Sequence, residues 1–442
     1  MALGSLLGSL YTATMGVNAQ STKFGTISDN IANVNTNGYK ANDTQFATLV
    51  AARQPYIADF GTGGVIPNNR QLLLSQGLLK TTESTTDIGI NGKGFFAVSR
   101  RDGLDTTSGA RLPGTDVLNT RAGSFQIDKD GYMVNVAGFA LLGQRLSDTD
   151  IANNGGNLPT VTETDPANLV PIRFESNPNL TITGQATRTV RIEANLPATD
   201  AIGAAPRDMY VNVYDSAGAT YSVQLQATKV AINRWSIAAV SASSSSADAA
   251  RVTVSPVPTI FTFNGDGTLA SPTGPQTLGS FAISNGSTMS PQFNFSGGAP
   301  SGGKLTQVGD TTVVTGAAQD GYPSGARMGV VIDAFGVVKE QFDNGQFVTR
   351  YRIPVINYIN PPGLEARSGN VWAQSETSGG PTITGANDGI GGVLEQQTLE
   401  SSTVDLSEEF SSMIVTQRAY SANTKTLTTA DEMYKTVVQM KG

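Results

Sequence analysis

The 442-residue chain contains no histidine and no cysteine, and only 15% of its residues are charged. Imidazole and thiolate metal sites, Ser–His or Cys–His nucleophile pairs and disulfide cross-links are therefore excluded. The net charge of -7 at pH 7 argues against nucleic-acid binding, because nucleic acids select basic surfaces. The hydrophobic content of 39% is too high for a largely disordered chain.

Long apolar runs are also missing, so we expect no membrane insertion. The first charged side chain is that of Lys23. A cleaved secretory signal would need a basic segment followed by an uninterrupted apolar one. Residues 1–10 contain no basic side chain, and Gly and Ser interrupt their apolar residues. If the protein is exported, we expect this to happen without a cleaved signal peptide.

Apolar residues at the N-terminus recur at alternating spacings of three and four. This pattern predicts a long helix that packs along one stripe against other helices. The other faces carry mostly Ser, Thr, Asn and Gly, so the helix should be marginal without a partner. The stripe comprises Leu3, Leu6, Leu10, Ala13, Val17, Gln20, Phe24, Ile27, Ile31 and Val34.

A second long helix is predicted at the C-terminus, where Asp405 can cap it and Glu408 can complete a capping box. We call the larger apolar members of the two terminal stripes the polymerisation seam. The C-terminal stripe comprises Leu406, Phe410, Met413, Gln417, Tyr420, Thr424, Leu427, Ala430, Tyr434 and Val437.

Two interpretations of these helices stay open. They could form part of an ordinary bundle, or they could pair as a coiled coil whose main partners are other copies of the chain. The position of both stripes at the extreme ends favours the second, because a single copy would leave them partly exposed.

Between the helices, short alternating runs separated by Gly-containing turns predict antiparallel sheets. Residues 53–70 and 377–392 are rich in Gly and Pro, and we interpret them as loops, with Gly61–Gly64 and 377–392 as flexible connectors. The predicted strands include 88–90, 95–98, 124–127, 132–134, 189–194, 209–214, 221–227, 235–237, 251–254, 260–263, 328–332, 336–338 and 351–355.

The predicted fold class is α+β, mainly β, with long terminal helices pairing as a coiled coil and two nested β-rich domains between them. The expected domains are discontinuous. Residues 1–71 and 400–442 form a helical domain, residues 72–145 and 320–399 form a first β-domain with linkers, and residues 146–319 form an inserted outer β-domain.

No segment carries a convincing catalytic pattern. Asn91–Gly94 lacks the spacing of a phosphate-binding loop, and we predict a hairpin turn there, as at 128–131 and 215–218. Residues 264–267 are predicted to form a turn. Asp333, Glu340 and Asp343 could pair for glycoside hydrolysis, but nothing in the sequence brings two of them together. We therefore predict a protein that is not an enzyme and has no catalytic, cofactor or metal site.

The two ends of the chain carry the segments ISDNIANVNTNGYK (residues 27–40) and LSEEFSSMIVTQRAYSAN (residues 406–423). These segments resemble the N-terminal and C-terminal signatures of the bacterial flagellar rod and hook family. Shorter blocks at 91–96, 120–125, 130–132 and 360–372 follow in the family's order. The residues carried over from the signatures are Asn30, Ala32, Asn33, Gly38, Tyr39, Lys40, Gln417, Arg418 and Tyr420, with Tyr39 where Phe is usual.

The long insertion before residue 320 resembles the hook branch of this family. That resemblance implies a structural subunit of a curved, flexible helical tube outside the cell, which transmits motor torque from rod to filament. The implied partners are other copies of the chain, the distal rod protein, the hook cap and hook–filament junction proteins, and the flagellar type III export apparatus. A distal rod protein of the same family and, more remotely, a β-rich surface adhesin stay open as alternatives.

Overall fold

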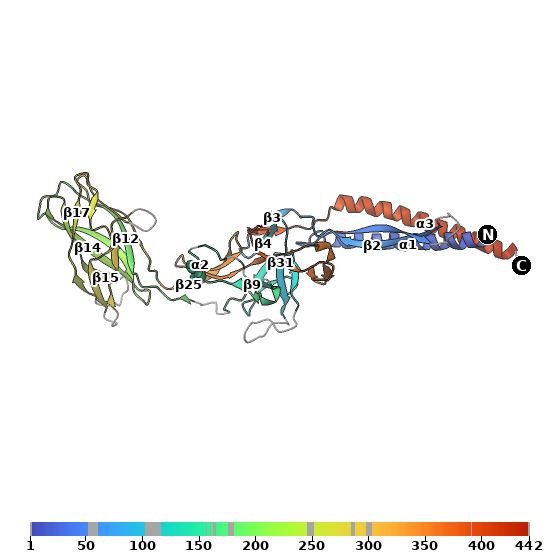
Figure 1. Ribbon diagram of the computed structural model, residues 1–442, viewed down its shortest axis with the longest axis horizontal. Coiled ribbons are helices and arrows are strands. Elements are labelled where there is room, and N and C mark those ends of the chain that lie inside the picture. The colour runs from blue at the N-terminus through green and yellow to red at the C-terminus, as the bar shows by residue number, and fades with distance from the viewer. Residues whose placement is uncertain are drawn as a thin grey trace. The chain divides into compact units, whose positions relative to one another are not determined.

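The computed structural model describes residues 2–51, 61–101, 116–155, 157–159, 161, 165–175, 181–244, 252–283, 288–297, 303–389 and 391–440. Across these residues the chain is mostly β-structure between two long helices, as predicted, and it also contains a short third α-helix (Figure 1). It divides into two compact units. Unit 1 comprises Met1–Ser176, Val330–Glu340 and Val348–Gly442, and unit 2 comprises Asn177–Gly329 and Gln341–Phe347.

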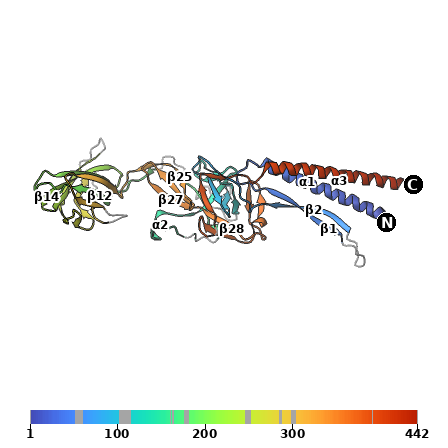
Figure 2. The same ribbon diagram turned by 90° about the horizontal axis from the view of Figure 1, so that it is seen from above.

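The two long helices of unit 1 are α1 (Ala2–Ala32) and α3 (Leu406–Met440). Figures 1 and 2 both show them side by side. They run antiparallel, because Asn30 near the end of α1 lies beside Glu409 near the start of α3. The predicted cap is present, since the Asp405 carboxylate accepts from the backbone N–H groups at 407 and 408, at 2.8 and 3.3 Å. Among the described residues, no helix is apolar over a length sufficient to cross a bilayer.

A two-stranded antiparallel ribbon follows α1, formed by β1 (Asn42–Ala51) and β2 (Gly61–Gln71). The loop predicted over 53–70 is therefore wrong for residues 61–70, and Gly61–Gly64 are strand residues rather than a flexible connector. Residues 53–60 of that loop lie outside the described residues. The ribbon packs along α1, where Gly64, at a φ of +106° and next to a bulge, lies against Met15. Pairing and packing thus override the Gly-rich composition.

The β-core of unit 1 is built from short strands around buried apolar side chains such as Phe96, Phe125 and Val355. In one sheet the strands β27-β9-β5-β6-β30-β29 are neighbours in that order, β8 and β10 also pair with β9, and β7 pairs with β8. Smaller pairs are β28-β31, β3-β33 and β32-β4. The elements are β3 (Leu79–Thr81), β4 (Ile88–Asn91), β5 (Phe96–Arg100), β6 (Leu118–Thr120), β7 (Phe125–Ile127), β8 (Met133–Asn135), β9 (Phe139–Arg145), α2 (Asp148–Asn153), η2 (Pro166–Asn168), β10 (Val170–Pro171), β27 (Phe347–Arg352), β28 (Pro354–Tyr358), η3 (Pro361–Gly363), β29 (Glu365–Arg367), β30 (Val371–Ala373), β31 (Pro381–Gly385), β32 (Val393–Gln396) and β33 (Thr398–Glu400).

Two predictions for this core are wrong in part. The connector predicted over 377–392 contains β31, which pairs with β28 along its whole length. The turn at Asn91–Gly94 is not a hairpin, because β4 pairs with β32 whereas β5 pairs with β6 and β9. It carries the chain from one sheet to another through glycines at φ +106° and +117°. By contrast, 128–131 does join β7 and β8 as a hairpin.

Unit 2 contains a five-stranded sheet of order β13-β14-β15-β17-β18, a second sheet of order β19-β22-β12-β23 with β24 also on β12, and the sheet β16-β20-β21. Its strands are β11 (Thr181–Ile182), β12 (Thr189–Leu196), β13 (Arg207–Tyr214), β14 (Thr220–Ala231), β15 (Arg234–Ser244), β16 (Val252–Pro256), β17 (Thr259–Phe263), β18 (Leu269–Ser271), β19 (Gln276–Thr277), β20 (Gly279–Ile283), β21 (Thr288–Met289), β22 (Gln292–Asn294), β23 (Lys304–Gln307) and β24 (Val313–Gln319); β25 (Gly325–Ile332) and β26 (Val337–Phe342) contribute residues to both units.

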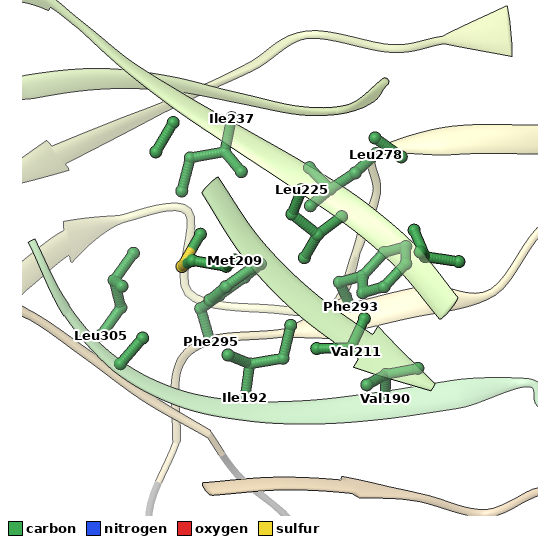
Figure 3. Packing of buried hydrophobic residues seen from close by; sticks show 14 of the residues in the cluster. Val190, Ile192, Met209, Val211, Leu225, Ile237, Leu278, Phe293, Phe295 and Leu305 are labelled. Atoms are coloured by element: carbon green, nitrogen blue, oxygen red, sulfur yellow. The ribbon is translucent and has the colours of Figure 1, made fainter. Parts of the chain in front are cut away.

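The buried side chains of unit 2 come from the strands whose alternating apolar residues predicted them. In β12 every second side chain is buried, and Val190 and Ile192 point toward Val211 and Phe293 (Figure 3). The predicted turn at 264–267 joins β17 to β18, and residues 215–218 join β13 to β14 as a hairpin.

Candidate assembly surface

The contact between α1 and α3 is made by small side chains. A Cβ added at Gly16 of α1 would lie 2.9 Å from the side chain of Asn423 of α3. Ala13, three residues before Gly16, is 5% exposed, and Thr416 of α3 is 2% exposed. The helices therefore approach closely along a row that the sequence stripes only partly include.

Six of the thirteen seam residues whose side chains the structure describes are exposed within one copy. Phe410 is 52% exposed and Tyr420 is 43% exposed, and the seam members Phe24, Leu406, Tyr434 and Val437 are exposed to between 37% and 39%. Ile27 is buried, whereas Leu10, Val17, Ile31, Val34, Met413 and Leu427 are partly covered. Val34 lies beyond the end of α1, and the side chains of Leu3 and Leu6 lie outside those that the structure describes.

The two stripes border one groove instead of facing each other. Its volume is about 460 Å³, and four of its seven lining residues belong to the predicted stripes. The lining residues are Gln20, Ser21 and Phe24 from α1 and Thr416, Gln417, Tyr420 and Ser421 from α3.

The side of α1 turned away from this groove is covered by the ribbon. Lys23 Nζ lies 5.6 Å from the centre of the Phe46 ring, within cation–π range. Deeper in the contact, the Thr44 hydroxyl donates to Asn69 Oδ1, at 2.8 Å, and lies 2.8 Å from the Thr26 hydroxyl. The groove and the outward faces of both helices thus stay uncovered, and Tyr11 of α1 is 60% exposed.

The signature residue Asn30 ties three segments together at the base of the helix pair. Its Nδ2 donates to the backbone oxygen of Asn42 at 2.8 Å and to Glu409 Oε1 at 2.7 Å. Its Oδ1 accepts from the backbone N–H of Asn42 at 2.9 Å and from the Tyr39 hydroxyl at 3.2 Å. Asn30 is 1% exposed, so an apolar replacement would leave these groups unpaired. The hydroxyl by which Tyr39 differs from Phe has a structural role here.

Lys40 ends the N-terminal signature inside a buried charge cluster. Its Nζ lies 2.6 Å from Glu400 Oε1 and donates to the backbone oxygen of Ser75 at 2.5 Å. Arg121 approaches the other carboxylate oxygen at 3.2 Å, and the Gly77 N–H donates to Oε1 at 2.8 Å. The three charged side chains are at most 5% exposed. Glu400 thereby fastens the N-terminal signature to the β-core directly before α3.

Gly38 sits where this cluster and the signature loop meet. Its φ is +69°, and a Cβ there would lie 2.5 Å from the backbone carbon of Arg121. Its N–H donates to the backbone oxygen of Glu400 at 2.7 Å. Both the left-handed backbone and the close approach require glycine.

The remaining signature residues have simpler surroundings. Asn33 closes the end of α1 by donating to the backbone oxygen of Asp29 at 2.9 Å and accepting from the Thr36 hydroxyl at 3.0 Å. Ala32, Gln417 and Arg418 are exposed, the last two on α3.

Burial sets the ionisation of the junction. It lowers the pKa of the Lys40 ammonium and of the Arg121 guanidinium, and the Glu400 carboxylate opposes both shifts. It raises the pKa of the Glu409 carboxyl, an effect that the hydrogen bond from Asn30 partly offsets.

Sequence reasoning missed Glu400, Arg121 and Glu409 as members of the site. A buried lysine in an otherwise uncharged signature loop needs a carboxylate as its ion-pair partner, but nothing in the sequence indicated which carboxylate this is. The carboxylates considered for catalysis have structural partners: Glu340 pairs with Arg350 at 2.6 Å, and Asp333 with Lys339 at 3.1 Å. Asp343 accepts from the backbone N–H of Ala326 at 2.8 Å.

Known families match successive parts of the chain. Residues 10–40 match the family described as Flagella basal body rod protein, and residues 89–194 match the Flagellar hook protein FlgE/F/G D1 domain. Residues 194–322 match the Flagellar basal body protein FlaE D2 domain, and residues 395–440 match Flagellar basal body rod FlgEFG protein C-terminal.

Individual relatives cover nearly the whole chain. It is 33% identical to Flagellar hook protein FlgE of Rhizobium meliloti and 30% identical to that of Brucella suis, in both cases over 99% of this chain and 100% of the relative. The crystal structure of Helicobacter pylori flagellar hook protein FlgE2 has a similar fold, with a TM-score of 0.50 and 16% identity over 73% of this chain and 100% of that chain. The identity of 33% across the full length of a hook protein establishes that this chain belongs to the flagellar hook protein family.

Proposed function

We propose that the chain builds the wall of a curved, flexible hook by joining copies of itself through the uncovered apolar side chains of its terminal helices. As a member of the flagellar hook protein family it is a structural subunit of the flagellum that self-polymerises. The observation that carries the proposal is the exposure of seam residues such as Phe410 and Tyr420 in a single copy. Such side chains lose contact with water when another copy covers them.

The proposal includes the pairing of α1 and α3 as a coiled-coil unit that lines the tube. Their antiparallel contact through Ala13, Gly16 and Thr416 supports this. It also includes the division into a helical domain (1–71, 400–442), a first β-domain (72–145, 320–399) and an outer β-domain (146–319). The compactness of unit 2 supports the last of these.

We place the assembled protein outside the cell, between the rod and the filament. On this proposal the chain passes through the flagellar type III export apparatus without losing a signal peptide, assembles beneath the hook cap, and contacts the distal rod protein and the hook–filament junction proteins. A chain with no cysteine cannot form disulfides that would block passage in an unfolded state.

A single charge in the seam tests the role of these helices. Phe410→Asp should abolish polymerisation on salting out, whereas the melting temperature of the monomer should stay nearly unchanged because the side chain is 52% exposed. Lys425→Gln, also on the exposed surface of α3 and with the same change in charge, should polymerise like the wild type. Polymers of normal yield from Phe410→Asp, seen by electron microscopy, would contradict the proposal.

A further inference from the structure

Six Asn–Gly pairs occur in the sequence, at 37–38, 91–92, 154–155, 264–265, 285–286 and 344–345. Asparagine is a labile residue, and it is most labile before glycine, because no side chain there hinders attack by the glycine nitrogen on the asparagine Cγ. Attack also requires that the glycine N–H is not held by another acceptor. The fold therefore decides which pairs can react. The pair 285–286 lies outside the described residues.

In four of the five described pairs the glycine N–H donates a hydrogen bond, so attack would first have to break that bond. In three of these pairs the acceptor is a backbone oxygen, and in the pair 91–92 it is the exposed side chain of Gln76. The bonds run from Gly38 to Glu400 at 2.7 Å, from Gly155 to Ala152 at 3.1 Å, from Gly345 to Phe342 at 3.1 Å and from Gly92 to Gln76 Oε1 at 3.1 Å.

The fifth pair, Asn264–Gly265, lies exposed in the turn that joins β17 to β18. Across the described part of the chain, no group accepts a hydrogen bond from the Gly265 N–H, and nothing lies within 4 Å of a Cβ built there. The bonds that hold the turn come from its neighbours: the Asn264 N–H donates to the backbone oxygen of Thr268 at 2.8 Å, and the Gly267 N–H to that of Asn264 at 3.0 Å. The Gly265 nitrogen is therefore available for attack.

We infer that Asn264 is a deamidation site, and that it reacts first among the five described pairs. The Gly265 nitrogen bonds to the Asn264 Cγ, the Cγ–Nδ2 bond breaks, and Nδ2 leaves as ammonia with the proton from the glycine N–H. Water then opens the cyclic imide at either carbonyl and gives aspartate or isoaspartate. Both products add a negative charge two residues before Asp266, and isoaspartate also adds a methylene group to the main chain of the turn. The reaction needs only water and is independent of self-assembly.

Peptide mass spectrometry of the folded full-length chain, after incubation at mildly alkaline pH, tests this assignment. The peptide that contains Asn264 should convert several-fold faster than the peptides that contain Asn37, Asn91, Asn154 and Asn344. In urea the five peptides should convert at similar rates, because the protecting hydrogen bonds are then lost. Equal rates in the folded chain, or faster conversion at one of the other four, would overturn the assignment.

Two variants test whether the glycine N–H controls the rate. Gln76→Ala removes the acceptor of the Gly92 N–H, so it should speed conversion at Asn91 several-fold and leave Asn264 unchanged. Gly265→Ala should slow conversion at Asn264, because the added methyl group has room in the turn but hinders attack. Circular dichroism should show both variants folded like the wild type. Unchanged conversion at Asn91 in folded Gln76→Ala would overturn the link between hydrogen bonding and deamidation.

Discussion

At the scale of single residues, Glu400 connects parts of the chain that lie far apart in sequence. It pairs with Lys40 of the N-terminal signature and with Arg121 of the β-core, and its own strand leads into α3. Removing one partner from a buried ion cluster leaves the others uncompensated, whereas exposed pairs contribute little. The strength of this attachment therefore depends on one carboxylate.

Glu400→Gln keeps the shape of the side chain and removes its charge. We expect the free energy of unfolding of unit 1 to fall by about 3–5 kcal/mol, because Lys40 and Arg121 then stay buried without a counter-charge. Urea denaturation monitored by tryptophan fluorescence measures this free energy of unfolding. The experiment uses a Trp235→Phe background, in which Trp372 of unit 1 is the remaining tryptophan. Glu365→Gln, which breaks the exposed pair with Arg367, is the control. It should change the free energy of unfolding by less than about 1 kcal/mol.

Glu409 makes the stability of the helix pair depend on pH. Because burial raises the pKa of its carboxyl, the folded state holds the proton more tightly than the unfolded state. This contribution to stability is present below the ordinary pKa of the carboxyl and is lost as the pH rises through the raised value. Glu409→Gln should therefore stabilise the helices relative to wild type at neutral pH and lose that advantage in acid. Circular dichroism melts of Glu409→Gln and wild type at neutral pH and in acid measure the difference in melting temperature.

Glu432→Gln, at an exposed position near the end of α3, is the control for the pH experiment. It should shift the melting temperature little at either pH. An equal difference between Glu409→Gln and wild type at both pH values would contradict the role assigned to burial.

At the scale of elements, the helices were predictable but their mutual packing was not. The spacing of apolar residues and the Asp405 cap locate α1 and α3, because local periodicity and capping determine where a helix begins and which residues share a face. The contact itself uses Gly16 against Asn423, a pairing that the periodicity of apolar residues does not indicate. Whether the predicted seam joins copies stays a prediction.

The close approach of α1 and α3 predicts a steric effect at Gly16. Gly16→Leu must displace Asn423 and should destabilise the helix pair by about 1–3 kcal/mol, as overpacking does. Gly25→Leu is the matched control in the same helix, since nothing lies within 4 Å of a Cβ there. It should stabilise the helix slightly through its higher propensity. Circular dichroism melts of both variants measure the difference, and equal stability would contradict the small-residue contact.

Some β-strands were predictable from the sequence and others were not. Alternation in β12, β13 and β14 predicted strands and buried faces correctly, because each is long enough to show period two. Gly-rich β2 and β31 were predicted as loops, since their pairing comes from distant segments that composition does not reveal. For the same reason the junction of Lys40, Arg121 and Glu400 could be found only in three dimensions.

At the scale of the whole molecule, composition and family agree. The chain has no side chains for thiolate or imidazole chemistry, and its relatives over nearly the full length are hook proteins. A subunit of this kind needs an uncovered surface that another copy can occupy. We propose that the exposed side chains of the helix pair supply this surface, next to the junction that fastens the helices to the β-core of unit 1.

On the proposed function, this chain polymerises by itself into a curved tube. Electron microscopy of the purified full-length chain after salting out tests it most directly. We predict curved tubes with regular helical repeats, because heterologous contacts between identical copies propagate as a helix. Straight rigid tubes would favour the distal rod alternative, and separate particles under all salting-out conditions would contradict self-assembly.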